Sequence, residues 1–267
     1  MIMKKIKLIV IVAMASFASC QDAIDIKQPS ELTPERAYET VADLRLGLNG
    51  VYAAIPGENQ IYFTSLFTDE VALGRSNGGQ GTDGELAFML NNTSGDAASI
   101  WLSNYAAINF ANRLILGAEN VDVEAGTAEE TEKNVILGQA HAIRAFANFQ
   151  LLSYFSENIK DDSSLGIILL DYVPLNTDQS PRSTTGEIFE FIEADLAFAD
   201  ANLATTLVTN RTFIGQNFVK AFRARMAAYR GDYALAKTYV DDLDATYNLT
   251  PKAQYAAIWL DSETPGS

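Results

Sequence analysis

The stretch FVKAFRARMAAYRGDYALAKTYV, residues 218–240, decides the fold of this chain. Apolar residues recur at steps of three and four on both sides of Gly231-Asp232, which predicts two amphipathic helices. A glycine followed by an aspartate is typical of a tight turn. Two helices joined in this way form a helical hairpin, expected here over residues 217–247. Such hairpins are the unit that tetratricopeptide repeats stack, although no strict repeat period runs through the rest of the chain.

Helical patterns continue N-terminal to the hairpin. Thr40 and Thr184 are each followed three residues later by an acid, which is the spacing of a capping box at a helix start. The apolar stripes predict helices at residues 41–55, 101–112, 129–155 and 184–199. The helix at 129–155 also carries several glycines and alanines, which permit close packing. These patterns assign the chain to the all-α class, with long loops and tetratricopeptide-like helical hairpins.

Two segments lack the helical pattern. Residues 57–96 hold short apolar pieces and a glycine-rich run at 74–84 that is typical of turns, so we expect a long loop. Loops of that length are usually functional or disordered. Residues 165–173 form an apolar run that we expect to be extended. A further helix start is indicated at Thr33-Pro34, where a capping residue precedes a proline.

The first twenty residues have the features of an export leader. Three lysines precede an apolar run at 8–17, which is too short to span a membrane. Small residues precede Cys20, the single cysteine, and this arrangement resembles a bacterial lipobox, in which lipid is attached to the cysteine. A buried apolar cysteine would leave the cationic N-terminus unexplained. We therefore expect residues 1–19 to be a lipoprotein signal peptide, Cys20 the lipidated first residue and anchor, 20–30 a tether, and 31–267 a helical domain.

The charge of the chain excludes one class of partner. The net charge is −15 at pH 7, from 19 basic and 34 acidic residues. Loss of residues 1–19 removes three lysines and no acid, which leaves 16 basic residues and a net charge of −18. Such a surface repels phosphate backbones, so we expect no nucleic-acid binding. With one cysteine, the chain forms no intramolecular disulfide, and the domain depends on packing.

The sequence offers little for catalysis. His141 is the single histidine and lies within a predicted helix, so we expect a structural residue and no metal site. The glycine-rich run lacks the Gly-Lys-Ser/Thr ending of a phosphate-binding loop, and no Gly-x-Ser-x-Gly motif is present. Carboxylates at 69, 70, 83 and 85 have the chemistry of a sugar-hydrolysing acid pair, but acidic loops are expected in a chain this anionic. We predict no catalytic residues and no cofactor.

Four stretches together resemble the SusD/RagB family, which comprises surface lipoproteins of Bacteroidetes outer membranes. They are WLSNYAAINFANRLI (101–115), GQAHAIRAFANFQLLSYF (138–155), PRSTTGEIFEFIEADLAFA (181–199) and FVKAFRARMAAYRGDYALAKTYV (218–240). The resemblance implies a SusD-like fold of tetratricopeptide-like hairpins and a partner, a TonB-dependent outer-membrane barrel of the SusC type. It also implies that the protein binds an oligosaccharide or peptide nutrient for import. Family members are typically longer, so the domain at 31–267 is expected to be incomplete at its C-terminus.

Residues 59–92 are the predicted ligand-binding segment, because sugars are held by polar side chains and by flat rings that cover their C–H faces. Asp69, Arg75 and Asn77 are the predicted ligand-binding residues, and Tyr62 or Phe63 offers a ring. Trp101 falls on a helical stripe, so we expect it in the core. Two other functions stay open: a surface-anchored tetratricopeptide-like scaffold without a small ligand, and a surface-anchored hydrolase.

Overall fold

The fold is built around two long helices, α4 (Gly95–Gly117) and α5 (Ala128–Phe155), which pack against each other. The computed structural model describes residues 37–68, 70–79, 84–91, 93–203, 212–245, 247 and 249–259. Cys20, the predicted signal peptide and tether, and the helix start at Thr33-Pro34 lie outside these residues. None of the helices within the described ranges is long and apolar enough to cross a membrane.

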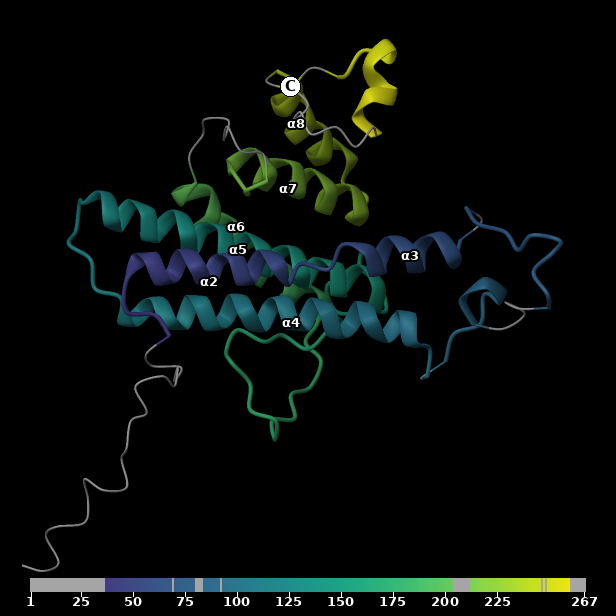
Figure 1. Cartoon of the computed structure of the whole chain (residues 1–267), viewed down its shortest axis with the longest axis horizontal. Coiled ribbons are helices and arrows are strands. Elements are labelled where there is room, and N and C mark those ends of the chain that lie inside the picture. Colours follow the sequence, from purple (N-terminus) through teal and green to yellow (C-terminus); the bar gives the residue numbers. More distant parts are fainter. Residues whose placement is uncertain are drawn as a thin grey trace, which may run out of the picture. The chain divides into compact units, whose positions relative to one another are not determined.

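The remaining helices surround this pair. They are α2 (Val41–Ala53), α3 (Glu58–Leu66), α6 (Thr185–Asn202), α7 (Gln216–Arg230) and α8 (Tyr233–Asp244), with short 3₁₀ turns η2 (Gly84–Ala87), η3 (Ala118–Asn120) and η4 (Lys252–Trp259). Figure 1 shows α2 lying beside α4 and α5, and each of these three helices packs on the other two. Over the described residues the structure contains no β-strand, which confirms the all-α prediction.

Helix α5 contributes to both apolar clusters of the core. In one cluster Phe149 meets residues of α6 and α7, and in the other Ile143 meets residues of α2 and α4. Fully buried alanines at 140, 142 and 145 let neighbouring helices approach α5 on several sides. The predicted role of the small residues in this helix is therefore confirmed.

The predicted helix boundaries are set by local hydrogen bonds. Thr40 and Thr184 both form complete capping boxes. Each threonine hydroxyl accepts a hydrogen bond from the backbone N–H of Asp43 or Glu187, and the carboxylate of that acid accepts one from the backbone N–H of the threonine. The hydrogen bond from the Thr40 hydroxyl, with two backbone N–H donors, lowers the pKa of Asp43. Gly231 closes α7 with φ of 84°, a left-handed conformation that glycine adopts without strain. The hairpin predicted from residues 218–240 is thus confirmed as α7 and α8.

The loop predicted at residues 57–96 is wrong in part. Helix α3 occupies Glu58–Leu66, directly after Pro56-Gly57, whereas α2 already ends at Ala53. Only Gln60 and Phe63 of this helix are buried. Two buried positions make too weak an apolar stripe for the sequence pattern to reveal a helix. From residue 67 to residue 94 the described part of the segment is irregular except for η2, as predicted, and α4 begins at Gly95.

Residues 165–173, predicted to be extended, contain one isolated β-bridge and a bend at 171–172, and side chains of α4 hold part of the segment in place. A single antiparallel bridge joins Leu165 to Thr184. The Tyr105 hydroxyl donates to the carbonyl of Ile168 at 2.8 Å and accepts from its N–H at 3.0 Å. Because this hydroxyl is largely desolvated, the pKa of Tyr105 is raised well above its usual range.

A buried polar network links α4, α5 and α6. The Arg144 guanidinium donates to both carboxylate oxygens of Asp195, at 2.9 and 2.7 Å, and to Asn112 Oδ1 at 2.7 Å. His141 Nδ1 lies 2.6 Å from Asp195 Oδ1. The network gives His141 a structural partner, in line with the prediction for this residue. The Arg144 guanidinium also stacks on Phe191, 4.7 Å from the ring centroid.

Candidate functional site

The predicted ligand residues lie in the connection between α3 and η2. Arg75 is exposed, and Asn77 is partly buried. The Asn77 side-chain oxygen accepts a hydrogen bond from the N–H of Gly79 at 3.1 Å, which fixes a local turn. Asp69 lies outside the described residues. The structure therefore places two of the three predicted residues in one surface segment, two positions apart.

Aromatic rings flank this connection. Tyr62 on α3 is 56% exposed, whereas Phe63 is buried and stacks on Phe67 with ring centroids 5.4 Å apart. Of the two predicted rings, Tyr62 is therefore the one that solvent reaches. Phe88 is a further exposed ring, at 60%, and packs at 5.9 Å from Phe67. Its φ of 56° is uncommon for a residue other than glycine, and such conformations often mark functional positions.

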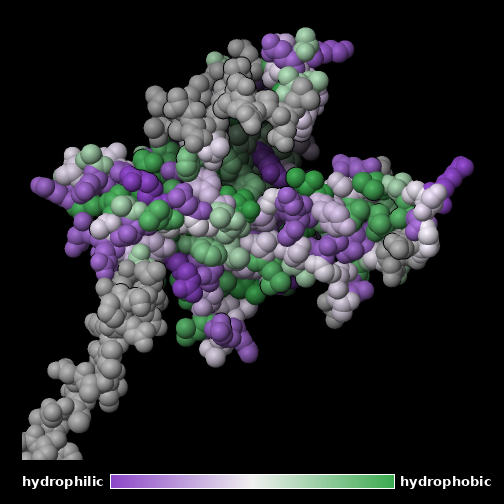
Figure 2. All heavy atoms as spheres, in the orientation of Figure 1, coloured by the Kyte–Doolittle hydropathy of each residue, from purple (hydrophilic) through white to green (hydrophobic). Residues whose placement is uncertain are grey.

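Apolar side chains extend this surface beyond the two rings. Ile61, Met89 and Leu90 are all exposed, in addition to Tyr62 and Phe88. Figure 2 shows hydrophobic residues interspersed with hydrophilic ones over the α3 end of the molecule. Exposed apolar side chains beside polar ones suit a surface that contacts a sugar. The run Phe88-Met89-Leu90 was the sequence signal for the C-terminal part of this surface, and our sequence analysis did not single it out.

The predicted core role of Trp101 is confirmed. Its ring packs edge-on against Phe155 at 5.1 Å and lies 4.8 Å from the ring of Tyr105. The side chain is partly buried against the larger apolar cluster. Trp101 therefore contributes to stability.

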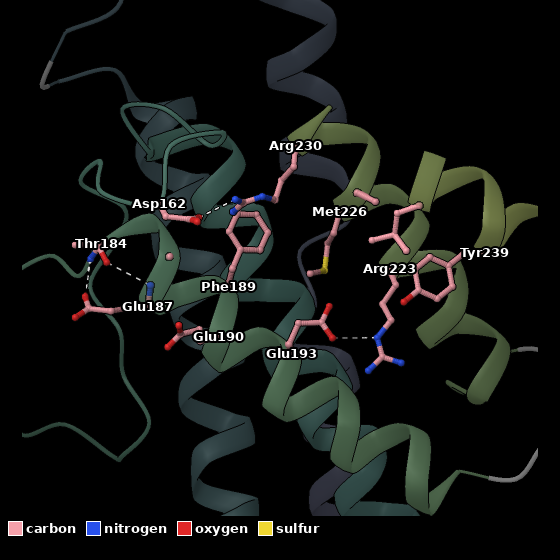
Figure 3. A pocket seen from close by; sticks show the side chains of 13 residues that line it. Asp162, Thr184, Glu187, Phe189, Glu190, Glu193, Arg223, Met226, Arg230 and Tyr239 are labelled. Atoms are coloured by element: carbon pink, nitrogen blue, oxygen red, sulfur yellow. Dashed lines mark hydrogen bonds and ion pairs between the residues drawn. The ribbon is translucent and has the colours of Figure 1, made fainter. Parts of the chain in front are cut away.

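A second candidate site, which the sequence analysis missed, is a cleft of about 540 Å³ between α6 and the α7–α8 hairpin. Phe189, Met226 and Ala227 provide apolar, nearly buried surface, and Leu235 and Tyr239 line the cleft from α8. Figure 3 shows the Tyr239 ring beside the Arg223 side chain. All the lining residues belong to the described part of the chain.

Two arginines in the cleft are held in place by carboxylates. Arg223 Nε donates to Glu193 at 3.1 Å, and its NH1 lies 3.3 Å from Asp200. Arg230 donates to Asp162 at 2.7 Å, and its guanidinium lies over the Phe189 ring at 4.4 Å from the centroid (Figure 3). Each guanidinium is therefore fixed in direction, with a carboxylate directly beside it.

The described residues contain no group of three or more histidine, cysteine, aspartate or glutamate side chains arranged to hold a metal ion. Of the four carboxylates considered as an acid pair, Asp69 and Asp83 lie outside the described residues. Glu70 accepts a hydrogen bond from the Ser65 hydroxyl at 3.1 Å. One oxygen of Glu85 is buried and has no hydrogen-bond partner among the residues that the structure describes. These contacts assign no catalytic role to Glu70 or Glu85.

Curated proteins with similar sequences are about twice as long as this chain. SusD-like protein P2 of Formosa agariphila is 26% identical over 278 aligned positions, which cover 99% of this chain and 51% of that protein. SusD-like protein P38 of the same organism is 24% identical, covering 98% of this chain and 51% of that protein. The chain therefore spans about half the length of these curated relatives.

Solved structures share the fold. A SusD superfamily protein from Bacteroides thetaiotaomicron aligns with a TM-score of 0.69 and 20% identity, over 82% of this chain and 50% of that one. A laminarin-binding SusD-like protein aligns with a TM-score of 0.65 and 21% identity, over 80% of this chain and 46% of that one. At these identities the likeness supports the fold, which is that of the SusD superfamily.

A family model decides the assignment. The SusD-like model described as "Starch-binding associating with outer membrane" matches residues 22–229, which is most of the chain. The matched region begins just after Cys20 and ends one residue before the end of α7, so it includes both candidate surfaces except for Arg230 and the residues of α8. The chain therefore belongs to the SusD-like family.

Proposed function

We propose that this protein is a surface lipoprotein that binds an oligosaccharide or peptide nutrient and delivers it to a SusC-like TonB-dependent barrel. The family description, starch binding in association with the outer membrane, is the observation that carries the proposal. Lipid on Cys20 would hold the protein on the outer membrane, with the helical domain exposed at the surface. More than one acyl chain is needed for stable attachment.

An oligosaccharide is the favoured ligand class. One of the similar solved structures is that of a laminarin-binding protein. The segment from α3 to η2 offers the chemistry that sugars need, with exposed rings at Tyr62 and Phe88 and polar groups at Arg75 and Asn77. We propose Asp69, Arg75 and Asn77 as ligand-binding residues of this segment.

Arg75→Ala tests this assignment. We expect affinity for the bound polysaccharide to fall about tenfold, because a charged donor to sugar hydroxyls is lost. Thermal unfolding should not change, since Arg75 is exposed. Affinity electrophoresis in gels that contain soluble starch or laminarin measures the first effect, and circular dichroism measures the second.

Arg113→Ala is the matched control for Arg75→Ala. Arg113 is also an exposed arginine, but it lies on α4, where its Nε donates to Asn109 at 2.7 Å. This variant should migrate like the parent protein in both gels. If Arg75→Ala retains full affinity for the polysaccharide that the parent binds, the ligand site lies elsewhere.

Two further measurements test the lipid anchor and the partner. Mass spectrometry of protein from the membrane fraction should find acyl chains on Cys20 as the first residue, and an unmodified thiol on cytosolic protein would overturn the anchor.

Affinity purification from the native membrane should recover a barrel. Recovery of other proteins without a barrel would favour the scaffold function, and release of reducing sugar from starch or laminarin by the purified protein would favour the hydrolase.

A further inference from the structure

We propose that the cleft between α6 and the α7–α8 hairpin is a second carbohydrate site, selective for uncharged over anionic sugars. The inference depends on the proposed glycan-binding function and adds a location and a ligand class to it. The cleft shares no residue with the segment from α3 to η2, because its lining residues lie between 162 and 239. Its volume of about 540 Å³ lies within the usual range of small-ligand sites, about 300–1,000 Å³.

The apolar surface of the cleft suits the C–H face of a sugar ring. Met226 and Ala227 form its α7 side, and Leu235 on α8 is partly exposed. The face of Phe189 is already covered by Arg230, so Tyr239 is the ring available for stacking. Tyr239 has no hydrogen-bond partner within the described part of the chain, which leaves its hydroxyl for a ligand.

The ion pairs of the cleft offer donors and acceptors side by side. Arg223 uses two N–H groups on Glu193 and Asp200, and Arg230 uses one on Asp162, so each guanidinium keeps N–H groups for other partners. Glu193 and Asp162 are largely solvent-exposed and keep acceptor capacity as well. Neighbouring sugar hydroxyls each donate and accept one bond, so a fixed donor beside a fixed acceptor matches a pair of them.

The charge of the cleft favours an uncharged ligand over an anionic one. Its lining contains four carboxylates, at 162, 187, 190 and 193, against two guanidiniums, at 223 and 230. A carboxylate or sulfate on the ligand would face this excess of negative charge, because a carboxylate beside each arginine already balances the arginine's charge. A cationic ligand would be attracted by the same carboxylates, so the charge of the lining selects only against anions. A neutral oligosaccharide avoids that repulsion and still uses the hydrogen-bonding groups.

Substitutions on opposite walls of the cleft test the proposal. Glu190→Ala removes an exposed carboxylate that has no hydrogen-bond partner among the described residues, and Tyr239→Ala removes the ring. With malto-oligosaccharides and laminari-oligosaccharides as probes, each variant should lower the affinity of the cleft about tenfold in isothermal titration calorimetry. Tyr239→Phe keeps the ring, so its affinity for these probes should fall much less than that of Tyr239→Ala. Glu129→Ala, an exposed glutamate at the start of α5, is the matched control and should bind as the parent does.

The outcomes separate this inference from the proposed function. If Arg75→Ala weakens binding while Glu190→Ala and Tyr239→Ala bind with parental affinity and stoichiometry, the cleft proposal fails and the proposed function stands. If the parent protein binds none of the neutral oligosaccharides, the cleft proposal fails, and the proposed function keeps its peptide alternative. Oligogalacturonate should bind the parent at least about tenfold more weakly than the neutral probes. Equal affinity for oligogalacturonate would overturn the charge selectivity. Melting curves of all variants exclude unfolding as the cause.

Discussion

Asp195→Ala should lower the free energy of unfolding by about 3–5 kcal/mol, because it leaves a buried guanidinium without its counter-ion. The side chains of Arg144 and Asp195 are only 7% and 3% exposed, so water cannot replace the lost carboxylate. The substitution breaks both bonds from Arg144 and the contact with His141. Urea denaturation followed by circular dichroism measures the loss.

Asp241→Ala is the matched control for Asp195→Ala. It removes the same side chain from an exposed pair with Lys237 on the surface of α8. An exposed helical pair at this spacing contributes about 0.5 kcal/mol or less, so the control should unfold almost as the parent does. Equal losses in the two variants would mean that the Arg144 network does not stabilise the helix packing in the way its burial indicates.

A double substitution separates loss of a charge pair from loss of packing. Combining Asp195→Leu with Arg144→Met removes both charges and leaves apolar side chains, which often restores the stability that a single substitution loses. Here the recovery should be incomplete. Asn112 Oδ1 would lose the donor it has from Arg144, and an unsatisfied buried acceptor costs about 1–3 kcal/mol. The same asparagine holds the carbonyls of Leu170 and Tyr172 through its amide.

The sequence predicted the structural features that depend on residues close together along the chain. The capping boxes at Thr40 and Thr184 and the turn at Gly231 involve contacts within three or four residues, so residue spacing is enough to identify them. Helix α3 was missed because Phe63 is its one buried apolar residue. A helix held by so few apolar contacts has no clear period in its sequence.

The cleft and the Arg144 network depend on contacts between distant residues. Arg223 meets Glu193 thirty positions earlier in the chain, and Arg230 meets Asp162 across 68 positions. Whether such residues meet depends on the relative rotation and offset of two helices, which apolar stripes define only coarsely. In α6, Phe191 stacks under Arg144, whereas Phe189 is buried and lines the cleft, and the predicted helix at 184–199 does not distinguish these two roles.

The two candidate sites differ in how closely they pack on the buried core. The stretch from α3 to Phe88 exposes Tyr62, Arg75 and Phe88 to solvent, and Gln60 and Phe63 are the buried residues of α3. The cleft lies directly over the core, because Phe189 and Met226 belong to the larger apolar cluster. Substitutions in the first segment should therefore change binding alone, whereas substitutions of buried cleft residues would also change stability. This difference is why the proposed cleft tests use Glu190 and Tyr239.

Phe149→Ala should also lower the free energy of unfolding by about 3–5 kcal/mol, because it opens a cavity where α5, α6 and α7 meet. Phe149 is 0% exposed. Its ring makes edge-on contacts with Phe189 on α6 at 6.4 Å and with Phe222 and Tyr229 on α7 at 5.4 and 5.2 Å. Chemical denaturation measures the loss, and a midpoint shift without a change in slope would show that the native fold is retained.

Phe110→Ala provides the comparison, since Phe110 lies on α4 with its ring about half exposed. Removing it leaves no cavity in the core, so a loss of less than about 1 kcal/mol is expected. Phe149 packs against Phe189, which lines the cleft. Phe149→Ala should therefore also weaken the binding of any ligand in the cleft, whereas Phe110→Ala should not. Equal stability of the Phe149→Ala and Phe110→Ala proteins would mean that α7 does not pack on α5 through this ring. The α7–α8 hairpin would then not form one wall of the cleft.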